Sequence, residues 1–140
     1  MTDPTATIER RIAVELEGGL RVAGVIGRHR VVTDQPPAGG GADSAPAPFD
    51  LFLVSLATCA GLYAARFLDA RGLDRAGLAV ELVERREPAE PARVAELELR
   101  MTLPEGFPEK YREAITRAVD QCAVKRHLDR PPRLATTLVG

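Results

Sequence analysis

The stretch that decides the fold is PAPFDLFLVSLATCAGLYAARFLD, residues 46–69. From Leu51 to Ala65 it contains no charged side chain, and a helix that is apolar on every side is normally buried on every side. The run is shorter than the about 20 apolar residues that a membrane span requires, and Asp50 and Arg66 bracket it. Proline is tolerated before a helix or in its first turn. We therefore expect a long buried core helix that starts at the prolines of this stretch.

A single thiol, Cys59, lies in the middle of the predicted helix, and the chain has one other cysteine, Cys122. Two cysteines are too few for a structural zinc site, which usually has four ligands. The N-terminal sequence MTDPTATIERR is polar and charged, so we expect no secretory signal and a cytoplasmic protein. Two interpretations stay open at this point. Cys59 can fill a core position as a small hydrophobe, or the two thiols can form a transient, catalytic disulfide, which is the commoner kind in the cytosol.

The size and charge of the chain limit the classes of partner. Its 140 residues predict a single domain that spans residues 1–140. A net charge of -1 and a pI near 6.1 give no reason to expect a nucleic acid or a membrane surface as partner. Four Phe, two Tyr and no Trp leave few rings on which bases could stack.

Alternating apolar residues predict short antiparallel strands on both sides of the helix. The expected strands are 8–17, 20–26, 28–33, 78–87, 94–103 and 133–139. The pair Gly18-Gly19 predicts a tight hairpin turn between the first two strands. Residues 34–48, rich in Pro, Gly and Ala, predict a loop that leads into the core helix, and residues 107–121 have the apolar spacing of an amphipathic helix.

The predicted order β-β-β-α-β-β-α-β is that of an α+β protein, with an antiparallel sheet on one side and helices on the other. The amphipathic helix 107–121 can be covered by its own sheet. The all-round apolar helix needs a second partner surface, which a homodimer supplies. The alternative is a monomer with a thicker helical layer.

Two motifs centred on the cysteines carry a resemblance to a known family. The run APAPFDLFLVSLATC is similar to the core-helix signature of the OsmC and organic hydroperoxide resistance family, and QCAVKRHL, from Gln121, resembles its second signature. The spacing of the two motifs and the order of the elements agree with that family from about Gly27 onward. The resemblance implies an OsmC-like fold that forms an intertwined homodimer with two sites at the subunit interface.

The resemblance also implies an activity, which is the thiol-dependent reduction of organic hydroperoxides or hydrogen peroxide without metal, flavin or other cofactor. Carried over to this chain, Cys59 would be the peroxidatic thiol and Cys122 the resolving thiol. The peroxide would oxidise the first thiol to a sulfenic acid, and the second would condense with it to a disulfide. A thiol reductant would then regenerate the pair.

The chain departs from the family pattern around both thiols. Members with peroxidase activity pair an arginine with an acidic residue ten positions before the peroxidatic cysteine; that position is Phe49 here, and Asp50 follows it. Arg28 or Arg30 could supply the guanidinium. In the second motif Ala123 and Lys125 stand where proline and histidine are common. A non-catalytic small-ligand-binding protein and a redox switch therefore remain as alternatives to the peroxidase.

Overall fold

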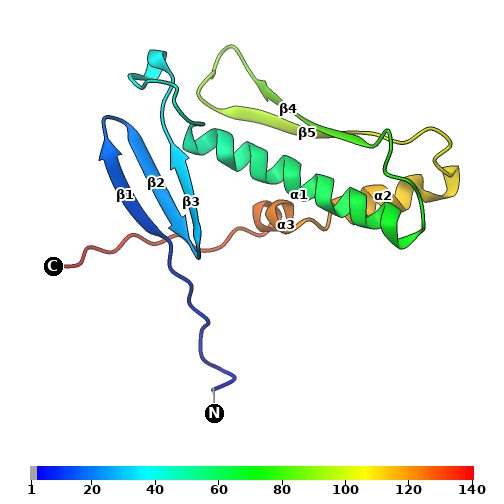
Figure 1. Ribbon diagram of the computed structural model, residues 1–140, viewed down its shortest axis with the longest axis horizontal. Coiled ribbons are helices and arrows are strands. Elements are labelled where there is room, and N and C mark those ends of the chain that lie inside the picture. The colour runs from blue at the N-terminus through cyan, green and yellow to red at the C-terminus, as the bar shows by residue number, and fades with distance from the viewer. Residues whose placement is uncertain (1–2) are drawn as a thin grey trace. The chain divides into compact units, whose positions relative to one another are not determined.

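The computed structural model describes residues 3–140, which form two compact units that divide after Leu51 (Figure 1). The N-terminal unit holds strands β1 (Ala13–Gly18), β2 (Arg21–Ile26) and β3 (His29–Thr33). Helix α1 (Pro48–Ala70) begins in this unit and continues into the second one. The C-terminal unit adds β4 (Ala79–Arg86), β5 (Val94–Thr102), α2 (Arg112–Val119) and α3 (Ala123–Asp129), while short 3-10 helices occupy Pro37–Gly39 and Glu109–Tyr111. The fold is α+β, as predicted from the sequence.

Strands β1, β2 and β3 form an antiparallel sheet in that order. The predicted hairpin is observed, but its turn lies one residue later than predicted: Gly18 is the last residue of β1 and pairs with Arg21, and Gly19 and Leu20 form the turn. Gly18 and Gly19 have positive φ angles of 110° and 56°, which side chains other than glycine rarely adopt. Paired residues of neighbouring strands lie on one face of a sheet, so the pair Leu16–Val22 belongs to an apolar face. Leu16 nevertheless keeps 83% of its surface exposed.

The loop that follows β3 is organised by the carboxylate of Asp34, which is almost fully buried. Its oxygens accept hydrogen bonds from the Gln35 amide at 2.8 Å, from the Ser44 amide at 3.1 Å and from the Ser44 hydroxyl at 2.6 Å. These bonds hold the pKa of Asp34 down at about 2, with the Ser44 hydroxyl as the largest cause. The loop predicted at 34–48 is thus an ordered segment that leads into α1.

Helix α1 buries one stripe of its surface. Leu56, Ala60 and Ala64 recur at every fourth residue and are buried, as expected for one face of a helix. The other faces are more open in the single chain, where Val54 keeps 51% and Leu62 keeps 47% of its surface exposed. By length and composition α1 could cross a membrane, but its buried stripe belongs to a packed core of helices and strands.

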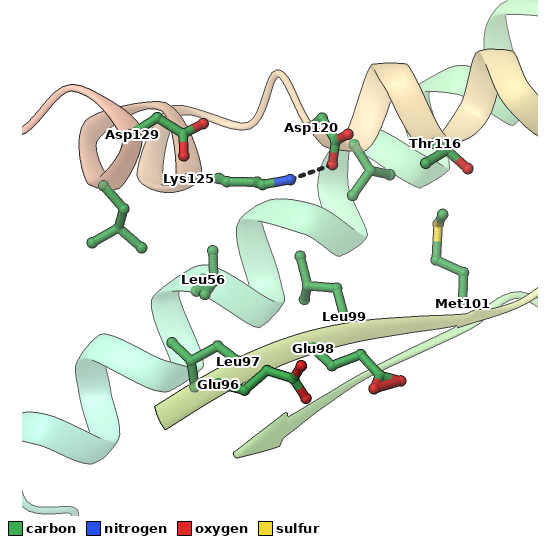
Figure 2. Close-up of a pocket in the computed structure, with 12 residues that line it drawn as sticks. Leu56, Glu96, Leu97, Glu98, Leu99, Met101, Thr116, Asp120, Lys125 and Asp129 are labelled. Atoms are coloured by element: carbon green, nitrogen blue, oxygen red, sulfur yellow. Dashed lines mark hydrogen bonds and ion pairs between the residues drawn. The ribbon is translucent and has the colours of Figure 1, made fainter. Parts of the chain in front are cut away.

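Strands β4 and β5 form a separate two-stranded antiparallel sheet with unlike faces. The pairs Val80–Met101 and Leu82–Leu99 make the apolar face, and Figure 2 shows Leu99 and Met101 rising from β5 on the side of α1. The opposite face carries ion pairs: Arg85 binds both Glu96 and Glu98 of the neighbouring strand, and Arg100 binds Glu98 and approaches Glu81.

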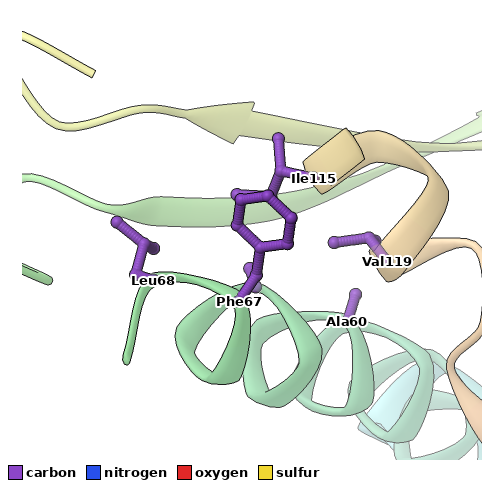
Figure 3. Close-up of a cluster of buried hydrophobic side chains, with 6 residues drawn as sticks. Ala60, Phe67, Leu68, Ile115 and Val119 are labelled. Atoms are coloured by element: carbon purple, nitrogen blue, oxygen red, sulfur yellow. The ribbon is translucent and has the colours of Figure 1, made fainter. Parts of the chain in front are cut away.

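The hydrophobic core lies where α1, α2 and the apolar face of the hairpin meet. Figure 3 shows Phe67 rising from α1 between Leu68 and Ala60 toward Ile115 and Val119 of α2. Leu68 and Ile115 are among the largest fully buried side chains of the described chain. These contacts fix the angle at which α2, and the segment that follows it, leave the core.

The predicted and observed elements differ in four places. The strand predicted at 8–17 is shorter and is β1 at Ala13–Gly18. The helix predicted at 107–121 is shorter, because the chain forms a 3-10 turn at Glu109–Tyr111 before α2 begins. The strand predicted at 133–139 is wrong for the single chain: residues 131–140 have no regular structure and are exposed. A strand requires a neighbouring strand for its backbone hydrogen bonds, and neither sheet includes this segment. The segment before residues 131–140 forms helix α3, which was not predicted. The observed order is therefore β-β-β-α-β-β-α-α.

Candidate active site

The two cysteines lie beside each other in the C-terminal unit. Cys59 is at the middle of α1 and half-buried, and Cys122 is fully buried in the break between α2 and α3. Both are free thiols. The Cys122 amide donates to the Val119 carbonyl at 3.0 Å, so the end of α2 holds Cys122 against the core. The contact between the two thiols is seen in the electrostatics of Cys122.

The pKa of Cys122 is raised above its ordinary value of 9.0. Burial is the largest cause, because it disfavours the charged thiolate. The Cys59 side chain raises the pKa further, through a hydrogen-bonding interaction and through its charge, while the Lys125 amide opposes the shift. Cys122 therefore stays protonated at neutral pH.

The Cys122 sulfur also caps α3. It accepts a hydrogen bond from the Lys125 amide at 3.3 Å, and Cys122 has the extended backbone of a residue that precedes a helix (φ -59°, ψ 141°). The side chain of Lys125 forms an ion pair with Asp120. Asp120 follows the last residue of α2, so the ion pair ties the end of α2 to the first turn of α3 on either side of the buried thiol.

A pocket of about 420 Å³ is lined by sequence neighbours of both cysteines, although neither cysteine is itself among the lining residues. Leu56 lines it one helical turn before Cys59, and Val119 and Lys125 line it three residues to either side of Cys122. Figure 2 shows the lining. Its apolar part consists of Leu56, Leu97, Leu99, Met101, Val119 and Leu128. Its polar part consists of Glu96, Glu98, Thr116, Asp120, Lys125 and Asp129. A pocket with apolar walls and a few polar groups is suited to a small, largely apolar molecule.

A comparison with known families decides the assignment. The sequence profile of the family described as OsmC-like protein matches residues 40–137, which include both cysteines. The chain belongs to the OsmC-like protein family. Among the curated proteins with which the OsmC-like chain was compared, none matches its sequence.

Solved structures share the OsmC-like fold. A protein from Psychrobacter arcticus, assigned to osmotic-stress induction and detoxification response, is 23% identical with a TM-score of 0.70, over 87% of this chain and 90% of that one. An OsmC-like protein from Mycoplasma pneumoniae is 15% identical with a TM-score of 0.67, over 89% of each chain. A protein from Vibrio cholerae, assigned to organic hydroperoxide resistance and holding captopril in one of its active sites, is 18% identical with a TM-score of 0.55, over 90% of this chain and 88% of that one.

The other residues predicted for the OsmC-like site belong to the N-terminal unit. Arg30 forms ion pairs with Glu15 and Glu17 of β1, and Arg28 lies exposed in the turn between β2 and β3. Asp50 lies exposed in the first turn of α1. The structure does not place either arginine relative to the thiols, so their roles stay predictions. The ion pairs show, however, that Arg30 already has two carboxylate partners within its own sheet.

Sequence reasoning missed two features of the site. The ion pair of Asp120 with Lys125 was not predicted because residues five apart do not face each other on a helix; here a helix break lies between them. The cap on α3 was missed because cysteine is not among the favoured N-cap residues. Across residues 3–140, no group of three or more His, Cys, Asp or Glu side chains is arranged to hold a metal ion.

Proposed function

We propose that this OsmC-like protein is a cytoplasmic thiol peroxidase that reduces organic hydroperoxides or hydrogen peroxide through a disulfide between Cys59 and Cys122. The observation that carries the proposal is the interaction of the two thiols, which are 63 positions apart in sequence. Two free thiols that interact can close to a disulfide where their α-carbons lie within about 4.4–6.8 Å. The family assignment supports a redox role for that contact.

The reaction proceeds in two balanced steps. The Cys59 thiolate attacks one peroxide oxygen, the O–O bond breaks, the alcohol leaves with a proton, and Cys59 becomes a sulfenic acid. The Cys122 sulfur then attacks the sulfenic sulfur, an S–S bond forms, and the hydroxyl leaves with the Cys122 proton as water.

The pocket supplies a site for the organic part of the peroxide. Its apolar walls suit an alkyl or aryl group, and Leu56, one helical turn before Cys59, is one of the residues that line it. The captopril held by the Vibrio cholerae protein shows that an active site of that protein accepts a small organic molecule. A dithiol reductant would return both cysteines to thiols.

A homodimer is part of the proposal. Val54 and Leu62 lie on the exposed side of α1, where a second copy of the chain would bury them. Leu62→Arg would place a charge in that contact, so we expect the variant to sediment as a monomer while the wild-type protein sediments as a dimer. Equal sedimentation of the two proteins as monomers would contradict the dimer.

The test of the activity is the consumption of cumene hydroperoxide with dithiothreitol as reductant. We expect Cys59→Ser to abolish turnover. Thr58→Ala is the matched control, because its exposed hydroxyl bonds only to the carbonyls of its own helix, and it should retain wild-type turnover. After one equivalent of peroxide, Cys122→Ser should hold a sulfenic acid at Cys59 and no intramolecular disulfide. Turnover that survives Cys59→Ser would remove the peroxidase assignment.

A redox switch is the second candidate, favoured by the hydrogen bond between the Cys122 sulfur and α3. That bond couples thiol chemistry to local structure whether or not the protein turns over. A switch would form the disulfide after one equivalent of oxidant and show no sustained peroxide consumption with excess dithiothreitol. A ligand-binding protein would show neither the disulfide nor the turnover.

A further inference from the structure

Helix α3 depends on few contacts of its own. None of its seven residues, Ala123–Asp129, is buried, and helices of this length are unstable in water without outside support. Its first turn carries no acidic side chain that would interact with the helix dipole. The chain that follows, residues 131–140, is exposed and without regular structure. The support for α3 therefore comes from its N-terminal end.

At that end the side-chain cap is the sulfur of Cys122, which accepts from the Lys125 amide. The ion pair of Lys125 with Asp120 adds a second tie, but both of these side chains are partly exposed, and such pairs contribute little in water. The sulfur cap and the hydrogen bond from the Arg126 amide to the Cys122 carbonyl at 3.0 Å thus connect the start of α3 to the buried Cys122, and only the first depends on the sulfur. The same sulfur is the one that would close on Cys59.

Disulfide formation changes this sulfur in two ways. It draws the Cys122 sulfur from a hydrogen-bonding interaction with the Cys59 thiol to the S–S bond length of about 2.05 Å, away from the position in which it caps α3. It also fixes the torsion about the Cβ–Sγ bond of Cys122, and with it the directions in which the sulfur can accept a hydrogen bond. Both changes weaken the hydrogen bond from the Lys125 amide.

We propose that oxidation of the cysteine pair uncaps α3 and opens the wall of the pocket that α3 forms, so that a dithiol reductant can reach the disulfide. The inference rests on the proposed function, because it requires the disulfide between Cys59 and Cys122. Lys125, Leu128 and Asp129 of α3 line the pocket. Figure 2 shows Lys125 and Asp129 extending from α3 along one side of it.

The burial of Cys122 explains why reduction of the disulfide would require this opening. Thiol–disulfide exchange requires that a thiolate of the reductant attack one sulfur directly. Cys122 is fully buried and Cys59 is half-buried, so the folded chain limits direct attack on the Cys122 sulfur. When α3 loosens, the first thiolate of the dithiol attacks the disulfide, and its second thiolate releases the mixed disulfide. The dithiol is oxidised to a disulfide, and its two protons are transferred to the sulfurs of Cys59 and Cys122, which become thiols again.

The test is amide hydrogen exchange of the full chain, followed in the peptides that cover residues 125–130. We compare the reduced and oxidised wild-type protein with reduced Cys122→Ala and Cys122→Ser. Serine is a good N-cap and alanine is not. We expect oxidised wild type and Cys122→Ala to exchange about fivefold faster in α3 than reduced wild type, the usual effect of losing a cap. Cys122→Ser should match reduced wild type, and exchange in β4 and β5 should be the same in all four samples.

The outcomes separate this inference from the proposed function. A disulfide found by mass spectrometry together with unchanged exchange in α3 would overturn the inference and leave the peroxidase proposal intact. Equal exchange in Cys122→Ala and Cys122→Ser would also overturn it, because the cap would then not hold α3. If no disulfide forms between Cys59 and Cys122 after oxidation, the proposed function fails first, and the redox control of α3 fails with it.

Discussion

Gly41, in the loop organised by Asp34, allows a sharp test of the structure. A Cβ built on Gly41 would lie 2.0 Å from the backbone oxygen of Gln35 and 2.6 Å from its carbonyl carbon, well inside the 3.0 Å that real Cβ atoms respect. The obstacle is backbone, which cannot rotate away as a side chain can. Gly41→Ala must therefore move the loop.

The size of the effect follows from the hydrogen bonds that this movement of the loop would break. The Gly41 amide donates to the Pro36 carbonyl at 3.1 Å, and the Asp43 amide donates to the Gln35 carbonyl at 3.0 Å. Losing both at about 1 kcal/mol each gives a loss of about 2 kcal/mol. For a chain of this size that loss corresponds to a fall in Tm of about 6–8 °C.

The assay is thermal unfolding followed by far-UV circular dichroism at one protein concentration, with Gly39→Ala as the control. Gly39 lies in the same loop, but its added Cβ would have its nearest neighbours at 3.6 and 3.7 Å, an ordinary contact distance. We expect Gly39→Ala to stay within about 2 °C of the wild type, since substitutions without a named structural cost are usually near neutral. Equal Tm values for the two variants would refute the described path of the loop.

Three further predictions concern the core and two ionisable groups. Leu68→Ala, at a fully buried position, should lower the free energy of unfolding by about 3 kcal/mol, while Leu134→Ala, at a position 91% exposed, should not change it; equal urea midpoints would refute the core assignment. The pKa of Cys122 is raised in the folded state. Its contribution to stability is therefore complete below the pKa of the unfolded thiol and is lost as pH rises through the higher folded value. Between pH 7 and 10 the urea midpoint should fall less in Cys122→Ser than in the wild type. Because hydrogen bonds from Ser44 hold the pKa of Asp34 at about 2, its contribution is complete above about pH 4 and is lost as pH falls toward 2, so Asp34→Asn should remove that part of the acid sensitivity in urea titrations.

The elements that depend on local pattern were predictable from the sequence. The strand predicted at 20–26 is β2 at Arg21–Ile26, and the strand predicted at 94–103 is β5 at Val94–Thr102. Their apolar alternation is set by which residues face the core, and that information is carried by each segment itself. The hairpin was predictable from the pair Gly18-Gly19, because glycine pairs favour tight turns, although the turn itself lies one residue later, at Gly19 and Leu20.

The elements that depend on distant partners were not predictable in this way. Residues 133–139 have the alternation of a strand, but a local pattern does not reveal whether a neighbouring strand is available. Helix α3 lacks a favoured polar cap and is held by Cys122, so only the fold reveals its start. The cysteines were found through their motifs, and their closeness was implied by the family resemblance. The structure adds the causes of the raised pKa of Cys122 and the hydrogen bond from the Lys125 amide to the Cys122 sulfur.

The hairpin of β4 and β5 has a consequence for how the protein behaves at high concentration. A two-stranded sheet leaves unpaired backbone along both of its edges, a template for association with other chains, and charged side chains discourage such pairing. The net charge of -1 gives almost no overall repulsion between molecules. Colloidal stability therefore depends on local charged groups, such as Arg85 and Arg100 with their glutamates. In 0.1 M salt the interaction of exposed charges is largely screened beyond about 10 Å. We therefore expect precipitation to begin in concentrated salt or in a buffer near the pI of 6.1.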